Sequence, residues 1–100
     1  MSESAEVEES GQEVRLRIRG ACDSDAVESF IATCQSLQLA DRQLVLDVSE
    51  VSSMDSSGLG MLLVARDVSR ASRVVRIQGA NQAVRRILDS VNFGQLFEIV

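Results

Sequence analysis

The chain has 100 residues, of which 45% are apolar and 25% are charged. This balance is typical of one soluble globular domain, and it excludes both two independent cores and disorder over the whole length. The sequence has no His and no Lys, and all ten basic residues are Arg. Without these side chains there is no Ser-His-Asp or Cys-His nucleophile system, no His metal ligand and no Walker A lysine. We therefore expect a protein that is not an enzyme and that uses neither a metal nor a cofactor.

The net charge is −5, and the acidic excess lies at the start of the chain. Five glutamates precede residue 14, whereas ten acids balance the ten arginines from there on. We expect residues 1–11 to form an acidic, weakly ordered segment or a short edge strand, and residues 12–100 to form the folded domain. Nucleic acid is not an expected partner, because there is no basic stripe and only three residues are aromatic.

Targeting and membrane segments are not visible in the sequence. The longest apolar run, residues 61–65, is far shorter than a membrane span, and no basic and apolar leader opens the chain. The two cysteines are too few for a disulfide scaffold. These features predict a cytoplasmic location without membrane insertion.

The first half of the chain alternates between strand and helix patterns. Residues 5–9 are a candidate edge strand of a leading hairpin, and residues 14–19 alternate apolar side chains with arginines, the period of a half-buried strand. Gly20 is expected to end that strand. Residues 26–37 carry apolar side chains at helical spacing. Residues 44–48 are an apolar run typical of a central strand that is covered on both sides.

The second half continues the alternation. A helix is predicted from about residue 57 to residue 72, a strand at 74–77 and a third helix over 82–91. Residues 92–94 break that helix, and residues 96–100 form a strand or a short packed segment. The order predicts an α/β fold with a mostly parallel sheet of four to five strands and three to four helices. In such sheets, sites form where strands end and helices begin.

One such junction is chemically unusual. It reads Val51-Ser52-Ser53-Met54-Asp55-Ser56-Ser57-Gly58-Leu59-Gly60. Asp55, Ser56 and Ser57 are all good capping residues, so a plain helix start is one interpretation. A serine in a first helical turn also faces unpaired N–H groups that can receive a phosphate. Gly58 and Gly60 each cost about 1 kcal/mol relative to Ala in a helix. The two glycines indicate either that a partner approaches the helix backbone closely or that the helix packs tightly on the sheet.

The helix that follows is apolar on most sides, through Leu59 and residues 61–65. Only one face can bury against a sheet, so we expect the remainder to be an exposed docking surface. Burial by neighbouring elements on both flanks is the alternative.

The segments 46–49 and 54–60 resemble the signature of STAS domains, specifically of bacterial anti-sigma factor antagonists. Residues 82–88, followed by Phe93 and residues 96–99, are similar to the third helix and final strand of that family. The resemblance covers roughly residues 12–100 and is closest to single-domain antagonists of Gram-negative partner-switching pathways. It implies the STAS fold. We expect a monomer or weak dimer, because an exposed apolar helix allows weak self-association.

The resemblance also implies a switch. Ser57 is then the phosphoacceptor of a GHKL-type serine kinase, often itself the anti-sigma factor, and a PP2C-type phosphatase removes the phosphate. Residues 20–23 are similar to a loop of the family at their first and last positions, which makes Asp23 a candidate rim residue beside Ser57. The partner-binding residues implied are Asp23, Asp55, Ser56, Gly58, Leu59, Gly60 and Met61.

Three other functions are weighed against the switch. A hydrolase dyad of Asp55 and Ser57 lacks His and Lys, and no Gly lies two residues before Ser57. Nucleotide binding at residues 58–60 is weakly indicated, because Leu63 stands where a full Gly-x-Gly-x-x-Gly motif has its last Gly. A constitutive STAS assembly subunit needs no phosphorylation cycle. The double serine favours the switch, because a structural cap needs only one.

Overall fold

The computed structural model describes residues 5–22 and 27–100. One five-stranded sheet has the order β1-β2-β3-β4-β5, with β1 antiparallel to β2 and the other neighbours parallel. The elements in chain order are β1 (Ala5–Glu9), β2 (Glu13–Cys22), α1 (Val27–Ser36), β3 (Gln43–Met54), α2 (Ser56–Val68), β4 (Arg76–Gln78), α3 (Gln82–Ser90), the short 3-10 helix η2 (Phe93–Gln95) and β5 (Glu98–Ile99). This architecture confirms the predicted α/β fold with a mostly parallel sheet.

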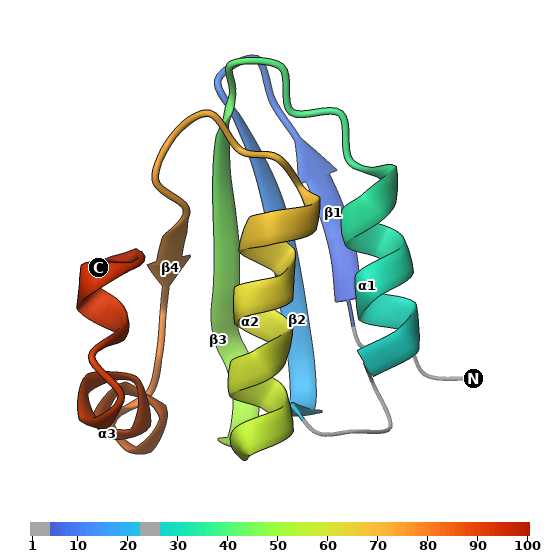
Figure 1. Cartoon of the computed structure of the whole chain (residues 1–100). Coiled ribbons are helices and arrows are strands. Elements are labelled where there is room, and N and C mark those ends of the chain that lie inside the picture. The colour runs from blue at the N-terminus through green and yellow to red at the C-terminus, as the bar shows by residue number, and fades with distance from the viewer. Residues whose placement is uncertain (1–4, 23–26) are drawn as a thin grey trace.

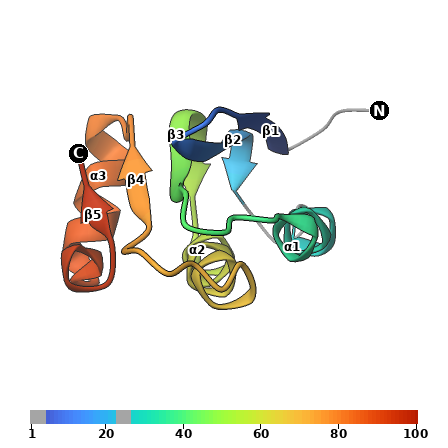
Figure 2. The same ribbon diagram turned by 90° about the horizontal axis from the view of Figure 1, so that it is seen from above.

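The helices are arranged around the sheet in a way that places the serine-rich junction at one edge. Figures 1 and 2 show α1 and α2 side by side on one face, while α3 lies towards the β4–β5 end. The strands β2 and β3 run in the same direction and end at the edge where α2 begins (Figure 1). The β3–α2 junction is therefore at the carboxyl edge of the parallel strands, where α/β folds form their sites.

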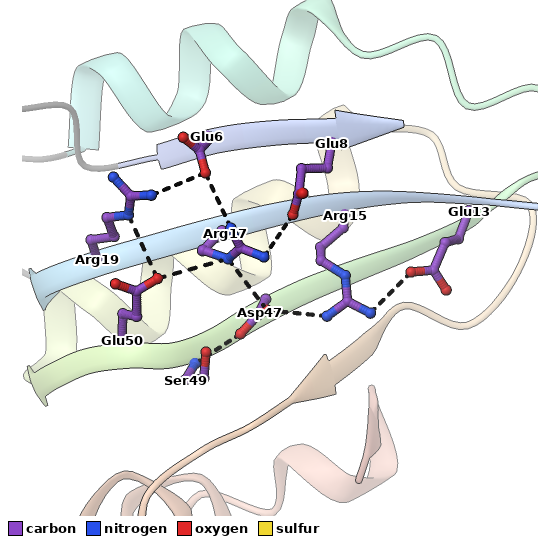
Figure 3. A network of polar contacts seen from close by, with 9 residues as sticks. All are labelled: Glu6, Glu8, Glu13, Arg15, Arg17, Arg19, Asp47, Ser49 and Glu50. Carbon is purple, nitrogen blue, oxygen red and sulfur yellow. Dashed lines mark hydrogen bonds and ion pairs between the residues drawn. The ribbon is translucent and has the colours of Figure 1, made fainter. Parts of the chain in front are cut away.

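The alternation predicted for β2 is confirmed by the burial of its side chains. Val14, Leu16 and Ile18 are almost fully buried in the core. The intervening side chains of Arg15 and Arg17 lie on the opposite face, which α1 and α2 do not cover (Figure 3). One face of this strand thus builds the core and the other carries charge.

A ladder of ion pairs covers that open face (Figure 3). Arg17 is at its centre, 2.6 Å from Glu8 and 3.2 Å from Glu6 on β1, and 3.6 Å from Asp47 and 3.8 Å from Glu50 on β3. Single exposed ion pairs contribute little to stability, but a network that joins three strands helps to fix their register. Residues 5–9 form the edge strand β1, and its glutamates face the arginines of β2.

Asp47 is the most buried acid of the ladder, with 6% of its surface exposed. Its Oδ2 accepts a hydrogen bond from Arg15 at 3.1 Å, and its Oδ1 accepts one from the Ser49 amide at 2.9 Å. Burial acts to raise the pKa of Asp47, but the hydrogen bonds from Ser49 and the Arg15 guanidinium outweigh it and hold that pKa below its ordinary value. The charged Asp47 carboxylate on β3 therefore links that strand to Arg15 on β2.

Several element boundaries differ from the sequence prediction. The second helix ends at Val68 rather than near residue 72, because Ser69 caps it and Arg70 takes a left-handed conformation with φ 54°. Val74 was predicted to begin the next strand, but it is 64% exposed and β4 starts at Arg76.

Two strands are also longer than predicted. The strand β2 continues past Gly20, which has φ 73° and lies at an irregularity in the register with β3. A glycine tolerates this conformation, so the strand bends there instead of ending. The partner strand β3 extends from Gln43 to Met54, because its second half pairs with the continuation of β2.

Candidate functional site

The start of α2 is built on a side-chain cap. Asp55 has an extended backbone, and its Oδ1 accepts a hydrogen bond from the Gly58 amide at 3.0 Å. The Leu59 amide donates to the Asp55 carbonyl at 3.0 Å, closing the first helical turn. The aspartate of the motif is thus the N-cap, and both serines lie inside the first turn.

The two serines differ in their surroundings. Ser56 is exposed, whereas Ser57 is half-buried. The first amides of a helix have no partner inside the helix, and Asp55 satisfies only that of Gly58. The Ser57 hydroxyl forms no hydrogen bond within the described part of the chain. Among the described residues this hydroxyl is thus without a partner, and it lies at the positive end of a helix, where negative charge is favoured.

The loop that follows β2 approaches the same edge of the sheet. Cys22, the last residue of β2, is in register with Met54, the last residue of β3. Asp23, predicted as a rim residue beside Ser57, lies outside the described residues.

The start of α3 is attached to this edge as well. The Asn81 Oδ1 accepts a hydrogen bond from the Val84 amide at 2.8 Å, and its Nδ2 donates to the Val51 carbonyl at 3.2 Å. Asn81 is thus the N-cap of α3, which begins at Gln82, the first residue of the predicted third helix. It also joins that helix to the segment of β3 that precedes the serine motif.

The structure corrects the expectation that Met61 is presented to a partner. Met61 is 2% exposed and belongs to the core, together with Leu62 and Ala65. Leu59 and Leu63 are half-buried and pack against that core. The apolar surface of α2 is therefore narrower than its composition indicates, because the sheet and the neighbouring α1 cover most of the helix.

The half-buried positions of α2 include a stripe of Ser57, Gly60 and Val64. These residues are spaced by three and four positions, so they share one helix face. A Cβ atom added at Gly60 would meet no heavy atom within 4 Å, so tight packing does not explain this glycine. Val64 was not among the predicted site residues, although its position seven residues after Ser57 places it on the same face.

The described residues offer no support for the other chemical interpretations. No group of His, Cys, Asp and Glu side chains among them is suited to hold a metal ion. The Asp55 carboxylate faces the Gly58 amide as a helix cap, which accounts for it without a hydrolytic role. None of the described helices combines the length and the apolar character that crossing a membrane requires.

Comparisons with known proteins agree with this geometry. A family model described as "Mlab, STAS domain" matches residues 5–99. A STAS-domain containing protein of Pseudomonas aeruginosa (strain UCBPP-PA14) is 34% identical over 90 residues, which is 89% of each chain.

Two solved structures have a similar fold. An anti-sigma factor antagonist from Mycobacterium paratuberculosis superposes with a TM-score of 0.80 at 17% identity, covering 95% of this chain and 82% of the other. The anti-sigma factor antagonist SpoIIAA in its unphosphorylated form gives a TM-score of 0.68 at 24% identity, covering 96% and 86%.

Proposed function

Because the chain belongs to the STAS-domain family, we propose that it is an anti-sigma factor antagonist that works as a phosphorylation-controlled partner switch. The form with a free Ser57 hydroxyl binds an anti-sigma factor or an analogous regulator. A GHKL-type serine kinase, which is either that partner or a separate protein, phosphorylates Ser57 and ends the binding. A PP2C-type phosphatase restores the binding form. The protein itself is a substrate and not an enzyme.

The observation that carries this proposal is the position of Ser57 at the head of the surface stripe on α2. Its hydroxyl is half-buried and has no hydrogen-bond partner among the described residues. Gly60 and Val64 extend the same face, so a partner that covers the stripe also covers the serine. The open space around Gly60 lets the backbone of that partner approach closely.

Phosphorylation acts on this surface through charge. A phosphoserine carries roughly −1.5 to −2 charges at neutral pH, and covering it with an apolar partner removes its hydration. The Asp55 carboxylate, two residues away and itself exposed, adds like charge to the same turn. A loss of about 3 kcal/mol in binding free energy lowers the affinity more than a hundredfold, which is enough for a switch.

The same charge does not harm the fold. A negative group in the first turn of α2 faces the unpaired amides and the positive end of the helix dipole, an interaction of about 0.3–1 kcal/mol. The Ser57→Asp variant is therefore expected to unfold at the same free energy as the wild type or slightly above it. Loss of partner binding in a variant that remains folded separates the switch from a simple folding defect.

The test compares Ser57→Ala and Ser57→Asp with the matched pair Ser56→Ala and Ser56→Asp. Binding to a GHKL-type serine kinase is measured by titration calorimetry, and phosphorylation is mapped by mass spectrometry. We expect Ser57→Asp to bind at least about a hundredfold more weakly, Ser57→Ala to bind without being phosphorylated, and both Ser56 variants to remain phosphorylated at Ser57.

The alternative is a constitutive assembly subunit that uses the same stripe without a phosphorylation cycle. In that case Ser57→Asp binds its partner as well as the wild type, and no phosphate is found on Ser57 under different growth conditions. That pair of results would overturn the proposed switch.

A further inference from the structure

A cavity of about 380 Å³ lies at the other end of α2, where that helix and the following turn meet the start of β4. Three arginines line it: Arg66 in the last turn of the helix, Arg70 in the turn and Arg73 before the strand. The only acid in the lining is Asp67. A protein with a net charge of −5 thus has a locally positive cavity.

These arginines are partnered differently from those of the sheet. Arg15 and Arg17 are held by carboxylates of the ladder, and Arg76 by Glu98. In contrast, the side chains of Arg70 and Arg73 form no ion pair or hydrogen bond with any residue that the structure describes.

Arg66 is only weakly paired, with 3.9 Å between its Nη1 and the Asp67 Oδ1. The three guanidinium groups are therefore available to an anion from outside the chain.

The backbone of the turn supports this assignment. Arg70 has φ 54°, a conformation that favours glycine and is unfavourable for a residue with a side chain. An arginine at this position is less stable than a glycine would be, and nothing within the described fold uses its charge. The conformation of the turn therefore does not explain why this residue is an arginine.

The lining also has an apolar side. Val74 is 64% exposed and Leu96, which precedes β5, is 37% exposed. Both are among the few large apolar residues that the fold leaves in water. A ligand that matches this surface combines a strongly anionic group with a small apolar part.

We propose that this cavity binds an organic phosphate, with a phosphomonoester dianion between the arginines and its apolar part against Val74 and Leu96. Three arginines and one aspartate give the lining a charge that balances a dianion, and each guanidinium can donate two parallel hydrogen bonds to phosphate oxygens. The cavity is independent of the proposed switch, since Arg66 lies nine residues from Ser57, roughly 14 Å along the helix axis.

The test is an NMR titration of the isotope-labelled full chain with phenyl phosphate, and with benzoate at equal ionic strength as the carboxylate comparison. We expect saturable shifts of the amides of residues 66–75 and 96, with a Kd of about 1 mM or tighter. The Arg70→Gln/Arg73→Gln variant should bind at least about tenfold more weakly. The matched control is Arg85→Gln/Arg86→Gln, two exposed arginines of α3 outside the cavity.

A second variant tests whether weaker binding of phenyl phosphate results from a loss of folding stability. Arg70→Gly suits the left-handed turn, so it should unfold at a higher free energy than the wild type while binding phenyl phosphate more weakly. Sedimentation with phosphatidic acid vesicles and with phosphatidylcholine vesicles then distinguishes the source of the phosphate.

Co-sedimentation with phosphatidic acid alone assigns the phosphate to a lipid headgroup, and its absence assigns it to a soluble ester. Equal binding of benzoate, or equal weakening by the Arg85→Gln/Arg86→Gln control, would overturn the proposal.

Discussion

Replacing Gly60 by Ala separates the stability of α2 from its proposed role in binding. The added methyl group meets no heavy atom within 4 Å in the free protein, so it introduces no clash. Glycine is about 1 kcal/mol less favourable than alanine inside a helix, and the variant should gain about that amount in unfolding free energy. For a domain of this size, the gain corresponds to a rise in Tm of about 4–8 °C.

Binding is expected to change in the opposite direction. If a partner approaches the bare backbone at Gly60, the methyl group overfills the interface, which typically costs about 1–3 kcal/mol. The affinity of the free-Ser57 form for its kinase partner then falls by about 5-fold to 150-fold. Denaturant unfolding followed by circular dichroism measures the first effect, and titration calorimetry with the partner measures the second.

Gly94→Ala provides the matched control for this experiment. Gly94 is exposed in η2 and its added Cβ also meets nothing within 4 Å, but it is not on α2. The control should leave the affinity unchanged. A Gly60→Ala protein that is more stable and binds its partner with wild-type affinity would refute the inference that a partner contacts this backbone.

Three further predictions concern the fold. Gly79→Ala should lower the unfolding free energy by about 2–4 kcal/mol, and Gly20→Ala should lower it by less. Both glycines have positive φ, but only at Gly79 would the added Cβ meet another atom, the Ser49 Cβ at 2.8 Å. Denaturant unfolding of the two variants measures the difference. Asp47→Asn should cost about 1–3 kcal/mol at neutral pH. The pKa of Asp47 is lowered in the folded state, so its contribution to stability is fully present above the ordinary carboxyl pKa. This contribution is lost as the pH falls through the folded-state pKa. The unfolding free energies of the wild type and of Asp47→Asn should therefore become equal in acid. Burial raises the pKa of the Cys34 thiol to about 12, so a thiol reagent at about pH 8 should modify it only at the rate of unfolding.

Local patterns were sufficient to predict most elements of the fold. The alternation in β2 identified which side chains are buried, because a strand with one apolar face has only one stable orientation against a core. The start of the third helix at residue 82 was also predicted from a local pattern, the helical spacing of its apolar side chains. Boundaries were less accurate where a long-range pairing or a special turn decides them, as at the extension of β3 beside β2 and at the left-handed Arg70.

The sequence predicted where the serine motif lies in the fold, but it did not predict which face of α2 is exposed. The sequence motif placed Asp55 and Ser57 at the start of α2, as found. A helix that is apolar on most sides gives no periodicity from which to choose its buried face, so Met61 was assigned to the surface although it is in the core. The buried face is decided by tertiary packing against the sheet and against α1, which the local sequence pattern of α2 does not encode.

The ladder of Figure 3 gives the first strand a role beyond pairing. Three glutamates of β1 form ion pairs with arginines outside that strand and neutralise them: Glu6 with Arg17 and Arg19, Glu8 with Arg17, and Glu9 with Arg42. A fragment cut before residue 12 would lose the carboxylates of Glu6, Glu8 and Glu9 and would expose the edge of β2 that β1 covers. Such a truncation is expected to associate with its own copies through that free edge, which makes β1 the element that protects solubility.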